Sequence, residues 1–135
     1  MRLEVFVKMA LMSVFLVGQM AWAATAADIK GALVPVRETL LEMLSKADKR
    51  GPEQVAEVKK TAQRVTEMIN GLKVDAAKKG AYDELKTVWT EFSKVRDEQV
   101  VPMIQAGKID EAKALANGEQ KARLKKVMEL CEQLK

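Results

Sequence analysis

Apolar residues recur three or four positions apart along most of the chain after residue 26, which is the spacing of one face of an amphipathic helix. No stretch alternates apolar and polar residues as a half-buried strand does. The pattern predicts four helices, over residues 27–49, from Pro52 to Asn70, from the N-cap Asp75 to a stop at Ala106-Gly107, and from Ile109 or Asp110 to Leu134. Because the connections are short, each helix is expected to run antiparallel to the previous one. The predicted fold is therefore all-α, an antiparallel up-down-up-down four-helix bundle.

Glycine and proline mark the expected helix ends. Gly51-Pro52 combines a stop with a restart, and Asn70-Gly71 ends the second helix. Pro35 removes a backbone donor within the first helix, which predicts a kink there or a helix that is regular only after Val34. The residues expected to face the core are Ile29, Leu33, Val36, Leu40, Met43 and Ala47, then Val55, Val58, Ala62, Val65, Ile69 and Leu72, then Tyr82, Leu85, Val88, Trp89, Phe92, Val95 and Met103, and finally Ala112, Leu115, Ala116, Val127, Leu130 and Leu134.

The fourth predicted helix departs from this pattern in its middle. Between Ala116 and Val127 the positions that should be apolar hold small and polar residues, namely Gly118, Glu119, Ala122 and Arg123. A gap in an otherwise aliphatic face indicates either a local structural adjustment or room for a ligand.

Residues 1–23 have the features of a signal peptide. Arg2 and Lys8 precede an uncharged run from Met9 to Ala27, and Ala21-Trp22-Ala23 is a small-x-small cleavage signal. We expect cleavage after Ala23, with a second frame three residues later, which leaves residues 24–135 as an exported bundle, periplasmic or secreted. The alternative is an uncleaved anchor, residues 9–27, that holds the bundle at the inner membrane.

Composition narrows the function classes. Histidine is absent and cysteine occurs once, at Cys131, so most metal sites, intramolecular disulfides and hydrolase triads are excluded. No cofactor and no enzymatic activity are expected. The 23 basic and 19 acidic residues are interspersed, which argues against a nucleic-acid interface. Cys131 is expected to be a small core residue or to form an intermolecular disulfide in an exported homodimer.

Several segments of the second half resemble a known module, the periplasmic four-helix-bundle sensor of methyl-accepting chemotaxis proteins. The resemblance spans roughly residues 27–135 and is most specific over residues 82–119. It rests on Tyr82-Asp83-Glu84-Leu85, Trp89-Thr90-Glu91-Phe92, Lys94-Val95-Arg96-Asp97-Glu98 and Ala106-Gly107-Lys108-Ile109-Asp110-Glu111-Ala112. It implies a ligand-binding bundle that pairs with a second copy through its first helix.

The match has two departures and leaves alternatives. Such receptors have a second membrane helix and a cytoplasmic signalling region, so the chain resembles a sensor module separated from its receptor, acting alone, with a membrane receptor or kinase partner, or as a relic. A haem-binding, cytochrome-like bundle is disfavoured because there is no histidine. A structural or chaperone-like periplasmic helical protein is the third reading.

A candidate ligand site follows when residues at equal distances from the turn are paired between the last two helices. If they turn near residues 106–108, Arg96 faces Glu119, Phe92 meets Ala122 and Trp89 meets Lys126. The group indicates either an exposed ion pair beside space-filling aromatic rings or an Arg-anchored site for a small carboxylate with aromatic walls. Arg37, on the first helix, is a second candidate, at a helix–helix or dimer surface.

Overall fold

The computed structural model describes residues 24–135, and every regular element within them is a helix. The helices are α2 (Ala26–Ser45), α3 (Pro52–Asn70), α4 (Lys79–Val95), α5 (Val101–Gln105), α6 (Ile109–Asn117) and α7 (Glu119–Gln133). A 3₁₀ turn, η1 (Ala76–Lys78), precedes α4, and a π-helical segment, η2 (Arg96–Val100), joins α4 to α5.

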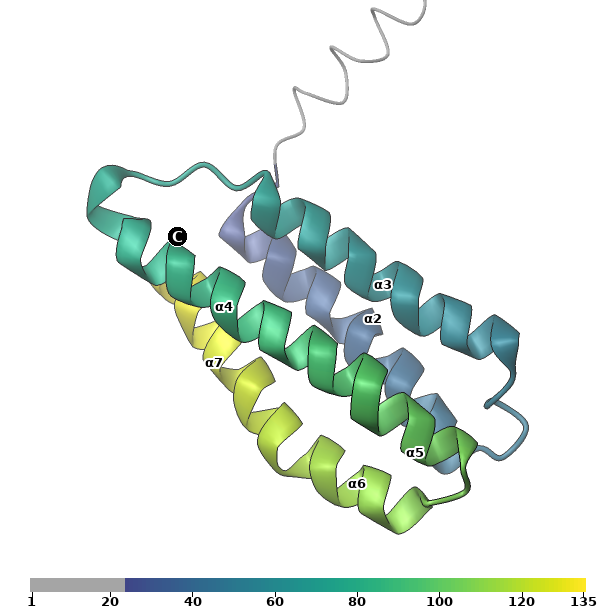
Figure 1. Ribbon diagram of the computed structural model, residues 1–135. Coiled ribbons are helices and arrows are strands. Elements are labelled where there is room, and N and C mark those ends of the chain that lie inside the picture. The colour runs from purple at the N-terminus through teal and green to yellow at the C-terminus, as the bar shows by residue number, and fades with distance from the viewer. Residues whose placement is uncertain (1–23) are drawn as a thin grey trace, which may run out of the picture.

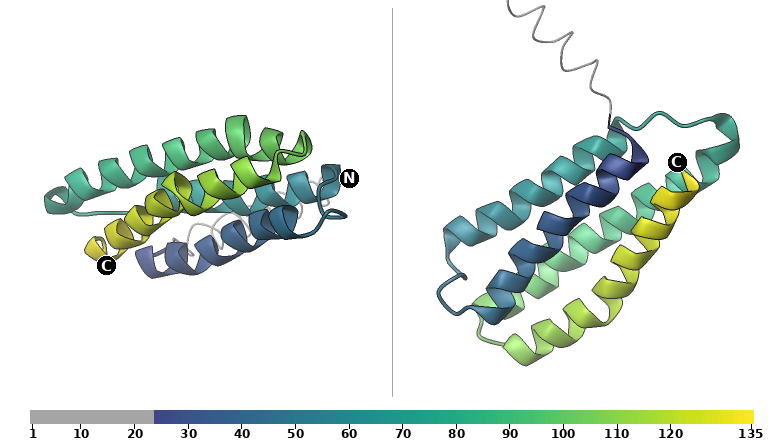
Figure 2. Two further views of the ribbon diagram at one scale, coloured as in Figure 1. Left: turned by 90° about the horizontal axis from the view of Figure 1, so that it is seen from below. Right: turned by 180° about the vertical axis from the view of Figure 1, so that it is seen from behind.

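These elements form four rods packed as a four-helix bundle (Figure 1). The third rod is α4, η2 and α5 in succession, and the fourth is α6 and α7. The turn after α2 and the turn after α5 lie at one end of the bundle, whereas the α3–α4 loop and the C-terminus lie at the other. Figure 2 shows α2 and α7 side by side, and an ion pair between Lys30 and Glu132 joins them near their outer ends.

The first helix begins and ends through local hydrogen bonds. The backbone N–H of Thr25 donates to Asp28 over 2.9 Å, and the Asp28 N–H donates to the Thr25 hydroxyl over 3.2 Å, which forms a capping box. At the other end, Arg50 donates to the carbonyl oxygens of Met43 and Leu44. The helix therefore stops at Ser45, and the prediction that it continues to residue 49 with Ala47 in the core was wrong.

The predicted start and end signals of the second helix are confirmed, and the first helix is not interrupted by its internal proline. α3 has Pro52 in its first turn and ends at Asn70 with Gly71 as C-cap. α2 continues through Pro35 without interruption, so the expectation that it becomes regular only after Val34 was wrong. The carbonyl that a proline ring crowds belongs to the residue four positions earlier, here Gly31, which is exposed and has no side chain.

The last two rods contain irregularities that periodicity did not predict. The third widens into a π-helical turn at Arg96–Val100, which ends two residues before Pro102, a residue that has no N–H to donate. The fourth is broken at Gly118, so the predicted single helix is two. A Cβ on Gly118 would lie 2.9 Å from the carbonyl oxygen of Ala114, so the break requires glycine. Gly107, with φ +80°, makes the tight turn between the two rods.

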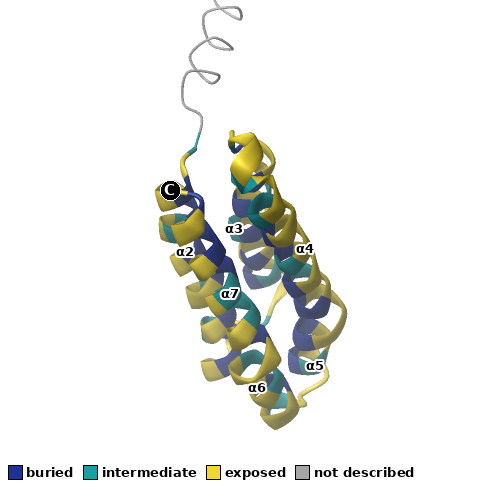
Figure 3. Cartoon of the chain, turned by 90° about the vertical axis from the view of Figure 1, so that its left-hand side faces the viewer, coloured by how far each residue is buried: buried dark blue, intermediate teal, exposed yellow. Residues whose placement is uncertain are grey.

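Buried side chains divide the core into two clusters along the bundle. Each helix turns its buried positions inward and its exposed positions outward (Figure 3). The terminal cluster, nearer the chain ends, includes Ile29, Leu33, Val36, Val65, Trp89, Phe92 and Leu130. The turn cluster, nearer the two tight turns, includes Leu40, Met43, Val58, Val100, Ile104 and Ala112.

Polar side chains occupy the boundary between the two clusters, and we call Thr39, Thr61, Arg96 and Gln120 the polar layer. The hydroxyls of Thr39 and Thr61 lie 3.4 Å apart, between α2 and α3. Arg96 and Gln120 are buried. Thr39 in α2, Thr61 in α3 and Gln120 in the α6–α7 rod each lie in sequence between residues of the two clusters. Arg96 lies where the third rod passes from one cluster to the other.

Candidate functional site

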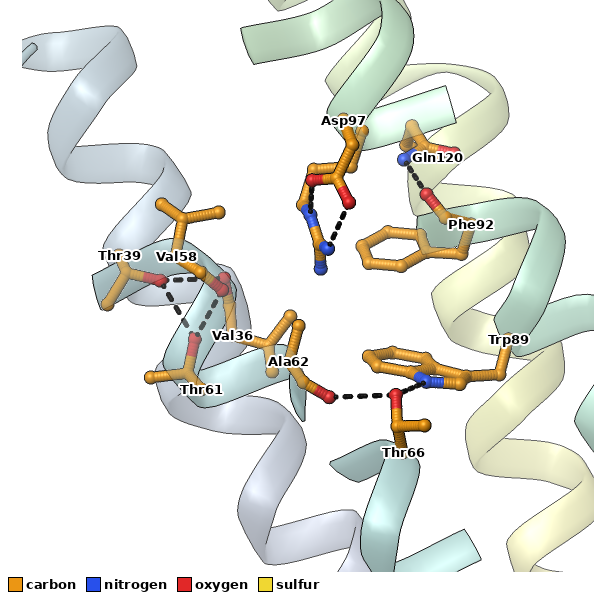
Figure 4. A network of polar contacts seen from close by, with 11 residues as sticks. Val36, Thr39, Val58, Thr61, Ala62, Thr66, Trp89, Phe92, Asp97 and Gln120 are labelled. Atoms are coloured by element: carbon orange, nitrogen blue, oxygen red, sulfur yellow. Dashed lines mark hydrogen bonds and ion pairs between the residues drawn. The ribbon is translucent and has the colours of Figure 1, made fainter. Parts of the chain in front are cut away.

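The two predicted aromatic residues stack inside the bundle. The rings of Trp89 and Phe92 lie 5.3 Å apart between centroids and are inclined by 21°. The Trp89 indole N–H donates to the Thr66 hydroxyl over 2.9 Å, and that hydroxyl donates to the Ala62 carbonyl (Figure 4). With its one donor satisfied and only 3% of its surface exposed, Trp89 is a core residue that links α3 to α4.

Arg96 has a different partner from the one predicted. Its guanidinium donates two hydrogen bonds to the neighbouring Asp97, at 2.9 and 3.0 Å (Figure 4), whereas Glu119 is exposed and pairs with Arg123 at 3.5 Å. The predicted Arg96–Glu119 pair was therefore wrong, because the break at Gly118 and the π-helical turn change the register between the rods. Arg96 is 3% exposed, and its Nη1 is buried without a hydrogen-bond partner among the described residues.

Gln120 ties the two irregular segments together. Its side-chain amide is buried and donates to the carbonyl of Phe92 over 2.9 Å, one turn before the π-helical segment. Its carbonyl oxygen accepts from Arg123 over 2.9 Å. Both ends of the amide are thus satisfied, and Gln120 fixes the start of α7 against α4.

A hollow runs along α2 and the α6–α7 rod. We call it the α2–α7 groove, and its volume is about 740 Å³. The Phe92 ring and the small residues Ala116, Gly118 and Ala122 contribute to its walls. The other apolar side chains of the lining are Leu33, Val34, Leu40, Leu41, Leu124 and Met128, and the rest of the lining is polar or charged.

The groove is lined by the large apolar side chains that are exposed outside the core. Three large hydrophobic residues of the described chain are exposed, Val34 at 54%, Leu41 at 39% and Met128 at 44%, and all three line this groove. Scattered exposed apolar residues are ordinary on protein surfaces, whereas three that line one hollow make it the candidate interaction site.

Basic side chains surround this apolar surface. Arg37 comes from α2 and Lys121 and Lys125 come from successive turns of α7, and none of the three forms an ion pair within residues 24–135. Lys30 is engaged by Glu132, and hydrogen bonds from Lys30 and then Lys135 hold the pKa of that carboxyl below its ordinary value. Glu38 is the one acidic side chain of the lining. The groove therefore presents an excess of positive charge beside an apolar surface.

The structure divides the predicted site residues into two groups. Phe92, Ala122 and Arg37 line the α2–α7 groove, although Ala122 is exposed on its wall and does not face the core as predicted. Trp89 and Arg96 belong to the interior, and Lys126, predicted opposite Trp89, pairs with Glu84 at 3.3 Å. Glu119 lies outside the lining.

Sequence reasoning missed most of the groove. The signal that could have found it is a second helical stripe beside the core stripe of α2, formed by Val34, Arg37, Glu38 and Leu41 at steps of three, one and three. Lys121, Lys125 and Met128 repeat the pattern on α7.

The lone cysteine is not available to a partner in the folded bundle. Cys131 is fully buried, and burial raises the pKa of its thiol to about 11. Cys131 packs as a small core residue, and its burial argues against the alternative of an intermolecular disulfide in the folded state. No group of three metal-ligating side chains occurs within residues 24–135.

The predicted signal peptide, residues 1–23, lies outside the described residues, as does most of the alternative anchor, residues 9–27. Among the described helices, none combines the length and the apolar character needed to cross a bilayer. The bundle itself begins at Thr25, two residues after the predicted cleavage point.

Comparison with known proteins gave no match: no family model, no curated protein and no solved structure matches the chain. The likeness to chemotaxis sensor modules therefore depends on the residues that carry it in the sequence, and the chemistry of the α2–α7 groove depends on its own side chains.

Proposed function

We propose that the chain is an exported, non-enzymatic, sensor-like bundle whose successive helices alternate in direction, and that its α2–α7 groove binds a small organic anion. The observation that carries this proposal is that the three exposed large hydrophobic residues of the described chain share one hollow with three basic residues that form no ion pair within residues 24–135. Short connections at Gly51 and Gly107 support the alternating direction of the helices.

The dimensions and charge of the groove suit such a ligand. Small-molecule sites are clefts of about 300–1,000 Å³ with mostly apolar walls and a few polar groups that orient the ligand. Arg37 supplies a planar guanidinium that matches a carboxylate, and Lys121 and Lys125 supply point charges on the opposite wall.

The sensor part of the proposal is supported by the sequence resemblance and the predicted signal peptide. A membrane receptor or kinase is the kind of partner that such a module would report to. The homodimer implied by the resemblance stays a prediction, now without a disulfide, and sedimentation velocity over a range of protein concentrations tests it.

A ligand screen tests the binding proposal. Thermal unfolding of the purified protein should show a saturable rise in Tm with at least one member of a panel of monocarboxylates, dicarboxylates and amino acids, since a ligand that binds the folded state stabilises it. Arg37→Ala should abolish the shift, and Arg64→Ala on α3, outside the groove, should retain it. A panel without any saturable shift, or equal losses in both variants, would overturn the proposal.

A further inference from the structure

The lining of the α2–α7 groove says what kind of anion fits it. One of the two uncharged polar side chains of the lining is already used: the Gln120 amide donates to the Phe92 carbonyl and accepts from Arg123, whereas the other, Asn117, is exposed. The two buried polar atoms without a partner among the described residues belong to Ser93 and Arg96, and neither residue lines the groove. A ligand rich in hydroxyl or amide groups would therefore lose its bonds to water and gain few in return.

Apart from the Phe92 ring, the apolar part of the lining is aliphatic and extended. Val34 and Leu41 are two helical turns apart on α2, so the apolar strip runs along the helix axis for about 10 Å. Met128, on the opposite wall, has an unbranched and adaptable side chain. A flexible alkyl chain fits such a strip better than a flat ring does.

Charged side chains lie within the strip on α2, where Arg37 is followed by the acidic Glu38, and beside it on α7. Arg37 lies between Val34 and Leu41 along α2, and Lys121 and Lys125 lie one turn apart on α7, all three without an ion-pair partner in the described part of the chain. One acidic head group placed between Arg37 and these lysines would be held by charge-assisted contacts while its tail covers the exposed apolar residues.

We propose that the α2–α7 groove binds a single-chain acidic amphiphile, such as a free fatty acid, with its tail along Val34, Leu41 and Met128 and its head between Arg37 and the α7 lysines. This inference rests on the proposed function and narrows it. The groove complements such a ligand in two ways, because the apolar strip contacts the tail and the basic side chains contact the head. A hydrophilic carboxylate lacks the tail, and a neutral alkane lacks the head.

A chain-length series tests the tail. Isothermal titration of the purified protein with butanoate, octanoate and dodecanoate, each below its critical micelle concentration, should give one saturable site. Because each fully buried methylene favours binding by about fourfold, octanoate should bind at least tenfold more tightly than butanoate, and dodecanoate at least as tightly as octanoate. Leu41→Glu, which places a carboxylate on the strip, should weaken dodecanoate binding at least tenfold, whereas Ala56→Glu, exposed on α3, should not.

A second arm tests the head. Dodecanol and dodecylamine should bind at least fivefold more weakly than dodecanoate, and Arg37→Glu should weaken dodecanoate binding while Arg64→Glu leaves it unchanged. Equal affinity for dodecanol and dodecanoate would overturn the role of the cations and with it the proposal.

The remaining outcomes separate this inference from the proposed function. Hydrophilic carboxylates that bind as tightly as dodecanoate would overturn the inference and leave the proposed function standing. No binding by any carboxylate would overturn both. Binding only to vesicles of anionic phospholipid, or a homodimer that Met128→Lys dissociates without any fatty-acid binding, would assign the groove to a membrane surface or to a second copy and overturn the inference.

Discussion

At the scale of single residues, the capping box at the start of α2 gives a pH-dependent contribution to stability. Hydrogen bonds from the backbone N–H and then the hydroxyl of Thr25 hold the pKa of Asp28 below its ordinary value of 3.8. A carboxyl with a lowered folded-state pKa stabilises the fold fully above the unfolded value, and this stabilisation is lost as the pH falls through the folded value.

The corresponding prediction compares Asp28→Asn with the unmutated protein. The variant should have a lower free energy of unfolding at pH 7 and at pH 5, and the difference should shrink as the pH falls below about 3.8. Urea unfolding at several pH values measures this. Asp48→Asn, in the exposed turn after α2, is the control, and a difference that stays constant down to pH 2 would contradict the assignment.

The same residues bear on export. Cleavage after Ala23 would keep the Thr25 cap, whereas cleavage three residues later would remove Thr25 and the buried Ala26, and loss of an N-cap costs about 1 kcal/mol. The predicted cut after Ala23 therefore also suits the fold, and N-terminal sequencing of the exported protein should begin at Ala24.

Arg96 illustrates a buried charge that contributes little to stability. Its partner Asp97 keeps 42% of its side chain exposed, and leaving Nη1 without a partner costs about 1–3 kcal/mol. Removing the guanidinium would return Asp97 to water and would not leave a buried charge behind.

We therefore expect Arg96→Met, which keeps the aliphatic volume, to lie within about 1 kcal/mol of the unmutated protein or above it in stability. Arg96→Ala should lose about 2–4 kcal/mol because it also leaves a cavity. Urea unfolding of both variants checks this. A loss of similar size in both would show that the charge itself stabilises the bundle.

At the scale of elements, both ends of α3 and the turn at Gly107 were predictable, whereas the end of α2 at Ser45, the start of α4 at Lys79, where Asp75 had been predicted as the N-cap, and the helix irregularities were not. Pro52, Gly71 and Gly107 act on their own few residues, so their signals are present in the sequence. The π-helical turn at Arg96–Val100 and the break at Gly118 depend on contacts between rods, including the Gln120 bond to Phe92. The fourth rod showed its break only as a missing stretch of apolar positions.

The break gives a prediction for two glycines. Gly118→Ala should destabilise the protein by about 1–3 kcal/mol, because its Cβ would meet the Ala114 carbonyl at 2.9 Å and α6 must shift against α7. Gly31→Ala, exposed in α2 with no atom within 4 Å of the added Cβ, should stabilise it by about 0.5–1 kcal/mol. Thermal unfolding measures both, and a neutral Gly118→Ala would show that the break tolerates other residues.

At the scale of the whole molecule, the all-helical four-helix bundle was predictable because its core stripes are periodic in every rod. The site was predictable only in part. Phe92, Ala122 and Arg37 were proposed from sequence and do line the α2–α7 groove. Pairing residues by equal rise along the last two helices failed for Arg96 and Glu119, because that method assumes two regular helices. The groove itself arises from the packing of α2 beside α7, which the sequence pattern of one helix does not reveal.

The split core has a consequence for how the protein opens. Each half of the bundle has its own apolar cluster, and the polar layer between them contributes little apolar burial, so the two halves are expected to unfold as separate cooperative units. Native-state hydrogen exchange should show lower protection in the half that contains η2, α5 and α6, whose helices are short or irregular. The groove spans the boundary, with Leu33 and Phe92 in one half and Leu40 in the other. A bound ligand would therefore contact both halves and slow amide exchange in both. Ligand binding would then change the motion of the entire bundle while its average structure stays the same.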